Sequence, residues 1–321
     1  MPPHKSDIRP ELLQASREIF ATWEAGDLPF SVAVERFEVL RKQALADNMP
    51  ADEGQIELQL GVMQGYRGNY IASIEHFEKA RDLFIRAENQ PMILRCMLNL
   101  GETFRLRGNF TRARQHFHTG YKAALKLDHR ELIVVARANE AQMLISQGRK
   151  DLADKMLKES LEMCAEPWEE PEAARSRKKR LDQHCEITHA LATLALDSGD
   201  VDGAWDYAVM SLDSAKEMNI PLRLGYANRA IAEVMTELKG LSDERFIMDP
   251  DEYFSAAIES FREVKADGEI ARTMAAHGRS LGKRGRNTSA ARMLQQAMVI
   301  FTRLGMADDA AKAAEAQLKL L

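Results

Sequence analysis

The chain of 321 residues contains few cysteines and no long apolar run. Its three cysteines, Cys96, Cys164 and Cys185, are an odd and widely spaced set, so they form no disulfide framework and fit a reducing compartment. No window approaches the roughly 18 apolar residues that a membrane span needs, and the first residues precede no apolar run of signal-peptide length. These absences predict a soluble, cytoplasmic protein with no membrane partner.

An excess of charge of one sign is missing too. The formal net charge is −5, which is small for this length and provides no global field that favours nucleic acid or an anionic membrane. The apolar fraction of 45% is ordinary and allows a continuous core. The length exceeds that of a usual single globular domain, but a repeat array escapes this limit because each unit packs only on its neighbours. We expect no nucleic-acid partner.

Motifs for catalysis are also missing. The sequence contains no glycine-rich phosphate loop, paired carboxylate motif or nucleophile–base signature. Cys185 and His189 have the i, i+4 spacing of a metal pair, but no further ligand cluster stands nearby and structural zinc needs four ligands, so core packing is favoured. His116 and His118 flank an aromatic residue, Phe117, and are predicted to be peripheral. We expect no cofactor, no metal and no enzymatic activity.

Glycines recur at a nearly constant spacing along the chain. The set is Gly26, Gly68, Gly108, Gly148, Gly199, Gly240 and Gly285, with spacings of 42, 40, 40, 51, 41 and 45 residues. A period near 40 indicates a repeat architecture. Asn or Asp follows several of them, as in Gly26-Asp27, Gly68-Asn69, Gly108-Asn109 and Gly199-Asp200. Each pair predicts a helix that ends at a left-handed glycine and a second helix capped by the Asn or Asp side chain.

On both sides of each turn the apolar residues follow helical spacing, which predicts a chain of helical hairpins. Around Gly108, we expect Phe104 and Phe117 to fill space while Gly101 and Gly120 let the two backbones approach. The predicted hairpins are residues 8–48, 52–89, 92–128, 131–164, 177–219, 222–265 and 267–305. The fold class is therefore all-α, a single superhelix (solenoid) of about seven hairpins over residues 1–321. A last helix, residues 307–320, caps the array, with self-association as its alternative role.

Two insertions, residues 165–180 and 241–251, interrupt the period. The first carries a basic run, Arg175–Arg180, whose two interpretations are a nucleic-acid or localisation signal and a solvated helix start. The glutamates just before the run favour the solvated helix start. The second insertion ends in Asp249, Pro250 and Glu252, which provide an N-cap, a first-turn proline and an N3 glutamate. A helix is expected to begin near Pro250.

The pattern resembles the tetratricopeptide repeat. One segment matches its consensus at every offset: Leu100-Gly101, Phe104, Gly108, Ala113, Phe117 and Gly120. The preceding hairpin departs from it at Gln64 and Ser73, and the last hairpin has Leu294 in place of an aromatic. The period near 40 also exceeds the ~34 residues of the standard repeat. Longer repeats of this kind are similar to those of kinesin light chains, spindle-orientation adaptors and the sensor domains of some bacterial regulators. HEAT repeats share the period but lack this glycine and alanine signature.

The resemblance implies a right-handed superhelix in which the first helix of each hairpin, the A helix, lines a concave groove. Such grooves bind an extended peptide or a helix of a partner protein. Asn99, Asn139 and Asn228 lie on A helices, where asparagine amides can donate to and accept from a peptide backbone. The alternative is three solvated or locally bonded side chains.

Arginines on the A helices favour a carboxylate-bearing, acidic partner, because arginine pairs with carboxylates through two hydrogen bonds. They are Arg95, Arg105, Arg137, Arg229, Arg272 and Arg279. The alternative is weak surface ion pairs. Glu102 and Gln142 complete the predicted groove set.

Two functions remain open at this point. The first is a non-catalytic scaffold that binds a peptide or protein segment in the groove. The second is the sensing part of a regulator, in which a small molecule or signalling peptide changes the curvature of the solenoid and the two insertions act as lids or contact sites. The sequence alone predicts neither the identity of the partner nor the oligomeric state.

Overall fold

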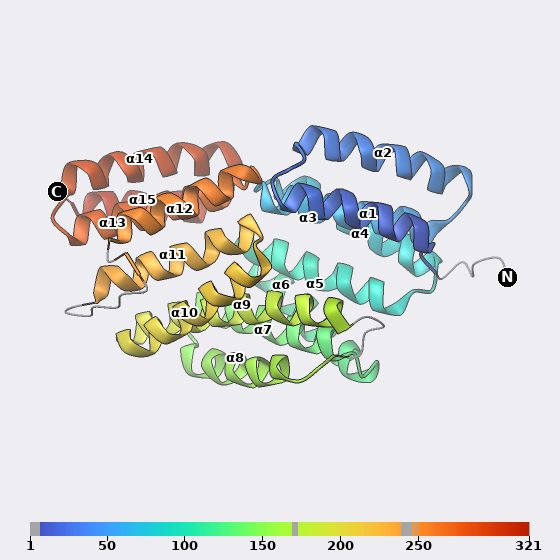
Figure 1. The fold of residues 1–321 in the computed structure, drawn as a ribbon, viewed down its shortest axis with the longest axis horizontal. Helices are drawn as coiled ribbons and strands as arrows, with labels where there is room; N and C mark the ends of the chain where they lie inside the picture. The colour runs from blue at the N-terminus through green and yellow to red at the C-terminus, as the bar shows by residue number, and fades with distance from the viewer. Residues whose placement is uncertain (1–6, 169–172, 239–245, 248, 321) are drawn as a thin grey trace. The chain divides into compact units, whose positions relative to one another are not determined.

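The computed structural model describes residues 7–168, 173–238, 246–247 and 249–320 (Figure 1). Within these ranges the chain forms fifteen α-helices and no β-strand. The prediction of an all-α helical-repeat fold is therefore confirmed. No helix in the described ranges is long and apolar enough to cross a membrane.

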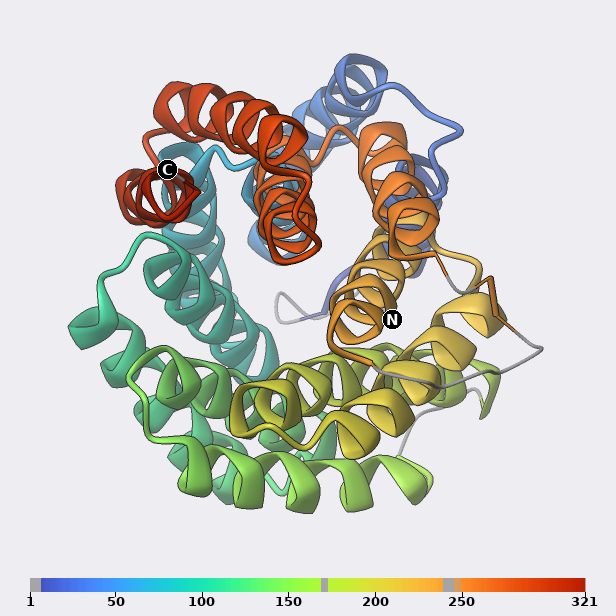
Figure 2. The ribbon, with the colours of Figure 1, turned by 90° about the vertical axis from the view of Figure 1, so that its left-hand side faces the viewer.

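The chain divides into two compact units, and the first is Met1–Met156. Its helices are α1 (Pro10–Glu24), α2 (Phe30–Ala46), α3 (Pro50–Tyr66), α4 (Tyr70–Arg86), α5 (Gln90–Leu106), α6 (Phe110–Lys126), α7 (Arg130–Ser146) and the first part of α8 (Lys150–Ala165). From α2 to α7 each helix packs on the next one along the chain (Figure 2). The A helices α3, α5 and α7 also contact one another in sequence, as expected for stacked hairpins.

The second unit is Leu157–Leu321. After the end of α8 it contains α9 (Ala173–Ser198), α10 (Val201–Met218), α11 (Pro221–Glu237), α12 (Pro250–Glu263), α13 (Asp267–Lys283), α14 (Asn287–Leu304) and α15 (Ala307–Leu318). Its A helices α9, α11 and α13 contact one another, and α14 lies against both α13 and α15 (Figure 2). That both units form one continuous array stays a prediction.

The turns inside the hairpins depend on left-handed glycine. Six of the seven predicted glycines have positive φ: Gly26, Gly68, Gly108, Gly148, Gly199 and Gly285. The seventh, Gly240, lies outside the described residues. At Gly108, φ is 76° and the amide donates to the carbonyl of Arg105, so the helix ends there.

The predicted caps after these glycines are partly confirmed. Asn109 accepts from the amide of Arg112 at 3.2 Å, and Asp200 accepts from the amide of Gly203 at 3.0 Å. The prediction is wrong for Asn69, whose amide group donates to the Gln64 side chain instead of capping α4. It is also wrong for Asp27, because α2 begins later, after Pro29.

The turns between hairpins use a second kind of left-handed residue that the sequence analysis missed. These residues are Asn48, Glu88, Asp128, Asn219 and Lys265, with φ between 49° and 59°. The first three are 40 residues apart, a signal that could have found them. A non-glycine residue tolerates this conformation at a modest cost. The chain therefore reverses direction through a left-handed residue both within its hairpins and, at these five positions, between them.

The structure describes parts of both insertions. Residues 169–172, 239–245 and 248 of these segments lie outside the described ranges. The helix α9 begins at Ala173, and Arg180 of its basic run donates to the carbonyls of Cys164 and Ala165 at the end of α8. The solvated interpretation is therefore wrong for Arg180. The helix α12 does begin at Pro250, where Asp249 accepts from the amide of Asp251.

Candidate functional site

Three amide side chains occupy the same position on the three stacked A helices of the first unit. The helices α3, α5 and α7 each have 17 residues and start 40 residues apart. Gln59, Asn99 and Asn139 are each the tenth residue of their helix. We call these three residues the amide row. The sequence analysis missed Gln59, although its offset of 40 residues from Asn99 could have found it.

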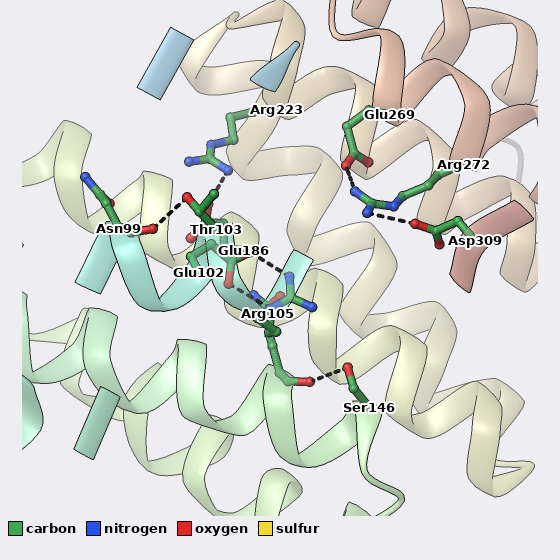
Figure 3. Close-up of polar contacts among 11 residues, drawn as sticks. Asn99, Glu102, Thr103, Arg105, Ser146, Glu186, Arg223, Glu269, Arg272 and Asp309 are labelled. Atoms are coloured by element: carbon green, nitrogen blue, oxygen red, sulfur yellow. Dashed lines mark hydrogen bonds and ion pairs between the residues drawn. The ribbon is translucent and has the colours of Figure 1, made fainter. Parts of the chain in front are cut away.

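The amides of this row are not used by the protein itself. Asn139 is only 9% exposed, while Gln59 and Asn99 are half-buried. Among the described residues none hydrogen-bonds to these three amide groups; only the backbone carbonyl of Asn99 is engaged, by the Thr103 hydroxyl (Figure 3). Gln142 behaves in the same way, since Ser146 donates to its backbone carbonyl and its amide has no described partner (Figure 3). A polar amide in a partly buried position gains free energy when a ligand supplies the missing hydrogen bonds.

The predicted arginines of the first unit, by contrast, are bound to groups of the same unit. Arg95 of α5 pairs with Glu131 of α7 at 2.6 Å. Arg105 forms two hydrogen bonds of 2.6 and 2.7 Å with Glu102, one turn earlier on α5 (Figure 3). These two arginines and Glu102 therefore contribute to the structure of the A helices.

Arg137 is the third predicted arginine of this unit. It donates to the Tyr121 hydroxyl at 3.1 Å and lies over the tyrosine ring, 5.7 Å from its centroid. Both contacts join α7 to α6, the preceding helix. An aromatic neighbour thus contributes to holding the guanidinium.

In the second unit the A helices are joined by arginine–carboxylate clusters. Arg223 of α11 forms two hydrogen bonds with Asp182 of α9, at 2.5 and 2.9 Å. It forms a third with Glu186 of the same helix (Figure 3). Arg272 of α13 pairs with Glu269 on the same helix and with Asp309 of α15 (Figure 3). The sequence analysis missed Arg223, since nothing in the sequence shows which carboxylates face it.

Arg229 lies deepest among the predicted arginines. Its side chain is 11% exposed, donates to Glu269 at 2.8 Å and lies over the rings of Tyr226 and Phe261. Burial acts to raise the pKa of Glu269, but the charges of Arg272 and Arg229 outweigh it and lower the pKa to about 2. Glu269 is therefore ionised at neutral pH, and Arg229 is already neutralised by it.

The last two predicted residues are more open. Asn228 is half-buried, and its amide makes no hydrogen bond to the described residues. It is the eighth residue of α11, so it does not share the tenth position of the amide row, which is Ala230 in that helix. Arg279 is 49% exposed and pairs with Glu233 at 3.6 Å. In both units the arginines hold the helices together and the amides remain available.

Cys185 and His189, the pair with metal-like spacing, lie in packed surroundings. In the described ranges no group of three or more His, Cys, Asp or Glu side chains is placed to hold a metal ion. Cys185 is buried next to Ser211, whose hydroxyl donates to its carbonyl. His189 packs against the ring of Tyr226. The spacing of Cys185 and His189 thus reflects packing between helices.

Comparison with known proteins agrees with this repeat architecture. A family model described as tetratricopeptide repeat matches residues 52–126. No curated protein sequence matches the chain. Many solved structures do, and three of them are described below.

A Rap protein complexed with competence and sporulation factor is similar to the chain, with a TM-score of 0.61 at 14% identity over 96% of this chain and 85% of that chain. The Rap conjugation gene regulator of the plasmid pLS20, in complex with the Phr* peptide, has a TM-score of 0.67 at 14% identity over 93% and 75% of the two chains. Aspartyl phosphate phosphatase F from Bacillus subtilis has a TM-score of 0.62 at 12% identity over 90% and 71%. At these identities the likeness establishes the fold.

Proposed function

We propose that this chain, a tetratricopeptide-like helical repeat protein, is a non-catalytic interaction module that binds an extended peptide or protein segment along the A helices of its first unit. Two proteins of similar fold are complexes, one with the Phr* peptide and one with competence and sporulation factor. That likeness supports a peptide or protein partner as the class of ligand. The geometry of the amide row indicates which residues bind this partner.

The amide row carries the proposal. Each side-chain amide offers a donor and an acceptor, which are the two groups that an extended peptide backbone needs. Neighbouring packed helices lie about 8–10 Å apart, and an extended chain advances about 3.3 Å per residue. Consecutive amides of the row therefore match peptide groups about three residues apart. Three amides would hold a segment of roughly six to nine residues in register.

Backbone recognition explains why the row contains amides and no charges. An amide reads the peptide backbone whatever the side chains are, so the row provides affinity without sequence specificity. The arginines of this face are already neutralised by Glu131 and Glu102 or held by Tyr121. An acidic peptide is therefore a narrower proposal, which these paired arginines of the first unit do not by themselves favour.

The test removes the row and leaves the fold in place. A peptide is first selected on the wild-type protein from a random 12-residue library. Its affinity is then measured for the triple variant Gln59→Ala, Asn99→Ala, Asn139→Ala. The control carries Gln43→Ala, Gln295→Ala and Gln296→Ala, three exposed amides on the second helices of other hairpins. We expect the dissociation constant to rise at least tenfold in the row variant and to stay unchanged in the control. Failure to select a peptide, or equal affinity of both variants, would contradict the proposal.

A sensing role is the second candidate, and the ion pairs between A helices favour it. Arg95–Glu131 joins α5 to α7 within the face that holds the amide row. A ligand that binds both helices would stabilise this packing, and the change would pass to neighbouring hairpins, since each repeat packs only on the next. A thermal-shift screen with signalling peptides and metabolites measures this stabilisation. The absence of any shift across a broad set would leave the scaffold role alone.

A further inference from the structure

The packing between the first two described hairpins of the repeat contains a buried carboxylate. Glu57 of α3 has a side chain that is 1% exposed. It accepts from His76 at 2.7 Å and from Lys79 at 2.6 Å, both on α4, and from Arg41 of α2 at 3.4 Å. We call this place, where α2, α3 and α4 meet, the first junction. In this junction, three cationic or hydrogen-bonding groups contact one carboxylate.

The next junction, where α4, α5 and α6 meet, repeats two of the three donors, has Thr119 in place of Lys79 and lacks the carboxylate. Forty residues along the chain, Arg81 of α4 and His116 of α6 stand where the first junction has its arginine and its histidine. Met97 of α5 stands where the first junction has its glutamate. We call this place the second junction. The arginine and the histidine are thus kept without the glutamate that both contact one repeat earlier.

One repeat further along the chain, at the third junction, a polar pair occupies the positions that correspond to Arg81 and Met97. There, Tyr121 of α6 and Arg137 of α7 stand at the same two positions, again 16 residues apart, and are joined by a hydrogen bond of 3.1 Å. In the first junction the pair at this spacing is Arg41 and Glu57. All three junctions lie in described residues. In the second, the apolar side chain of Met97 replaces the polar partner that Glu57 and Arg137 provide in the other two.

A hollow of about 380 Å³ lies at the second junction. Met97 and Phe104 of α5 line it together with Glu78 of α4 and with Arg112 and His116 of α6. This volume is near the lower end of small-ligand sites. It exceeds what a carboxylate alone needs, so it has room for an apolar body next to the methionine and phenylalanine side chains.

The phenylalanine in this hollow contacts two polar side chains of α6. The His116 ring stacks on Phe104 with centroids 5.5 Å apart and planes 18° apart. The Arg112 guanidinium lies over the same ring, 5.2 Å from its centroid. The prediction that His116 is peripheral is therefore wrong, because it lies half-buried between α5 and α6. The stack fixes the two nitrogen-bearing groups at the edge of the hollow.

The charges around the hollow favour an anion. Arg112 forms no ion pair with the described residues, and Arg81 pairs with Asp82, its exposed neighbour in the chain. Burial lowers the pKa of His116, and the positive charges of Arg81 and Arg112 lower it further. Glu78 is the carboxylate among the lining residues.

The first junction shows that a glutamate at this position does not exclude a second carboxylate. Glu38 stands 40 residues before Glu78 and pairs with Arg41, which also binds Glu57. Two carboxylates are thus accommodated around one arginine in the first junction. The second junction has the same arrangement of helices and one carboxylate fewer.

We propose that the second junction binds a carboxylate from outside the chain, carried on a small apolar body that lies against Met97 and Phe104. The carboxylate lies next to the Met97 side chain, which stands where Glu57 stands one repeat earlier; His116 and Arg112 bind it, and the charge of Arg81 acts on the same place. This site lies on α4, α5 and α6 and uses none of the amide row. This proposed site does not depend on the proposed peptide-binding function, so either can be wrong without the other.

The first test restores the missing carboxylate within the chain. In Met97→Glu the new side chain would take the place of the ligand, so the pKa of His116, followed by NMR, should rise by at least one unit. Met97→Gln has the same shape without the charge and should leave that pKa nearly unchanged. A His116 pKa that is the same in both variants would overturn the proposal, whatever the stability of either variant.

The second test uses ligands on the otherwise unmodified protein. Phenylacetate should shift the amide and imidazole resonances of His116 in a saturable way, and 2-phenylacetamide, its neutral counterpart, should not. Arg112→Gln should weaken phenylacetate binding about tenfold, whereas Arg114→Gln, an exposed arginine two residues along α6, should not change it.

A peptide arm distinguishes the source of the carboxylate. A capped Glu-Phe dipeptide is compared with capped Gln-Phe in the same titration. Binding of Glu-Phe without binding of phenylacetate supports the site and assigns its carboxylate to a peptide. Equal binding of acid and amide, or binding of neither acid, would overturn it. Neither result bears on Gln59, Asn99 and Asn139, so the two proposals fail separately.

Discussion

A Cβ atom on Gly101 of α5 would lie 2.6 Å from the Phe117 ring of α6. Phe117 is fully buried, and the next side chain along α6, His116, would be 3.1 Å from the same atom. The two helices therefore touch through a position that only glycine fits. Gly61 and Phe77 form the same contact one repeat earlier, at 2.7 Å. This pair is the contact that defines the hairpin.

The first prediction tests that contact. Gly101→Ala should lower the free energy of unfolding by about 1–3 kcal/mol, because the buried ring must move to accept the methyl group. Gly65→Ala is the matched control, since its nearest side-chain atom is the Ser73 hydroxyl at 3.2 Å and the gain in helix propensity, up to about 1 kcal/mol, offsets the crowding. Urea unfolding measures both. Equal stabilities of the two variants would contradict the predicted role of Gly101.

The second prediction concerns acid. Burial acts to raise the pKa of Glu57, but hydrogen bonds from His76 and Lys79 and the charge of Lys79 lower it from 4.5 to about 2. When the pKa of a carboxyl group is lower in the folded state than in the unfolded state, the ionised group stabilises the fold at pH values above the unfolded pKa. The protein should therefore lose about 3 kcal/mol from this group as the pH falls from about 4.5 to about 2. Unfolding free energies measured across this range check it.

A variant isolates the contribution of Glu57 to this loss. In Glu57→Gln the acid-dependent decline should be smaller, and stability at pH 7 should fall by up to about 3 kcal/mol, the contribution of the ionised carboxylate. Asp251, whose pKa is also lowered to about 2 despite burial, by Arg284 and His277, should still produce part of the decline in this variant. A Glu57→Gln protein with an unchanged pH profile would contradict the assignment.

The third prediction separates geometry from charge at Arg223. Arg223→Lys keeps the positive charge but loses the two parallel hydrogen bonds to Asp182, so it should destabilise the second unit by about 1–3 kcal/mol. Arg177→Lys is the control, because the pair of Arg177 with Glu217 is exposed and contributes little. Thermal unfolding of the two variants measures the difference. A Lys variant as stable as the wild type would show that charge alone is sufficient.

The fourth prediction concerns the thiols. All three cysteines are buried, and burial raises the pKa of Cys96 and Cys164 to about 12 and that of Cys185 to about 11. The reactive species is the thiolate, so iodoacetamide at pH 8 should modify the native protein far more slowly than the denatured protein. Mass spectrometry counts the labels. One thiol that reacts as quickly as free cysteine would show local opening of its helix.

The repeat pattern could be predicted because it depends on local chemistry. A glycine such as Gly108 ends a helix by its own backbone conformation, and helical spacing is enough to predict that Phe104 and Phe117 are buried. Caps were predicted less well, as at Asn69, since a side chain chooses between its own helix and a neighbour such as Gln64. The inter-hairpin residue Glu88 was missed because its left-handed conformation is rare for a glutamate.

The candidate site shows the opposite balance. Arg95 and Glu131 are 36 residues apart, and Arg223 and Asp182 are 41 apart. Sequence gives no sign that these partners meet, so Arg95 was predicted to favour an acidic ligand, with a surface ion pair as the alternative, and Arg223 was missed. Asn99 and Asn139 were predicted for the same groove, and the structure leaves their amides without partners among the described residues.

The sequence by itself determined the period, the helices and the close contact at Gly101, because each follows from a single residue or from spacing within one helix. The tertiary structure decided which polar groups remain available. Whether Arg95 binds a ligand or Glu131 depends on the stacking of α5 on α7. The replacement of Glu57 by Met97 one repeat later indicates a binding site only when the two junctions are compared in space. A charge that finds a partner within the fold is neutralised there, and only the stacked repeats show which charges do so.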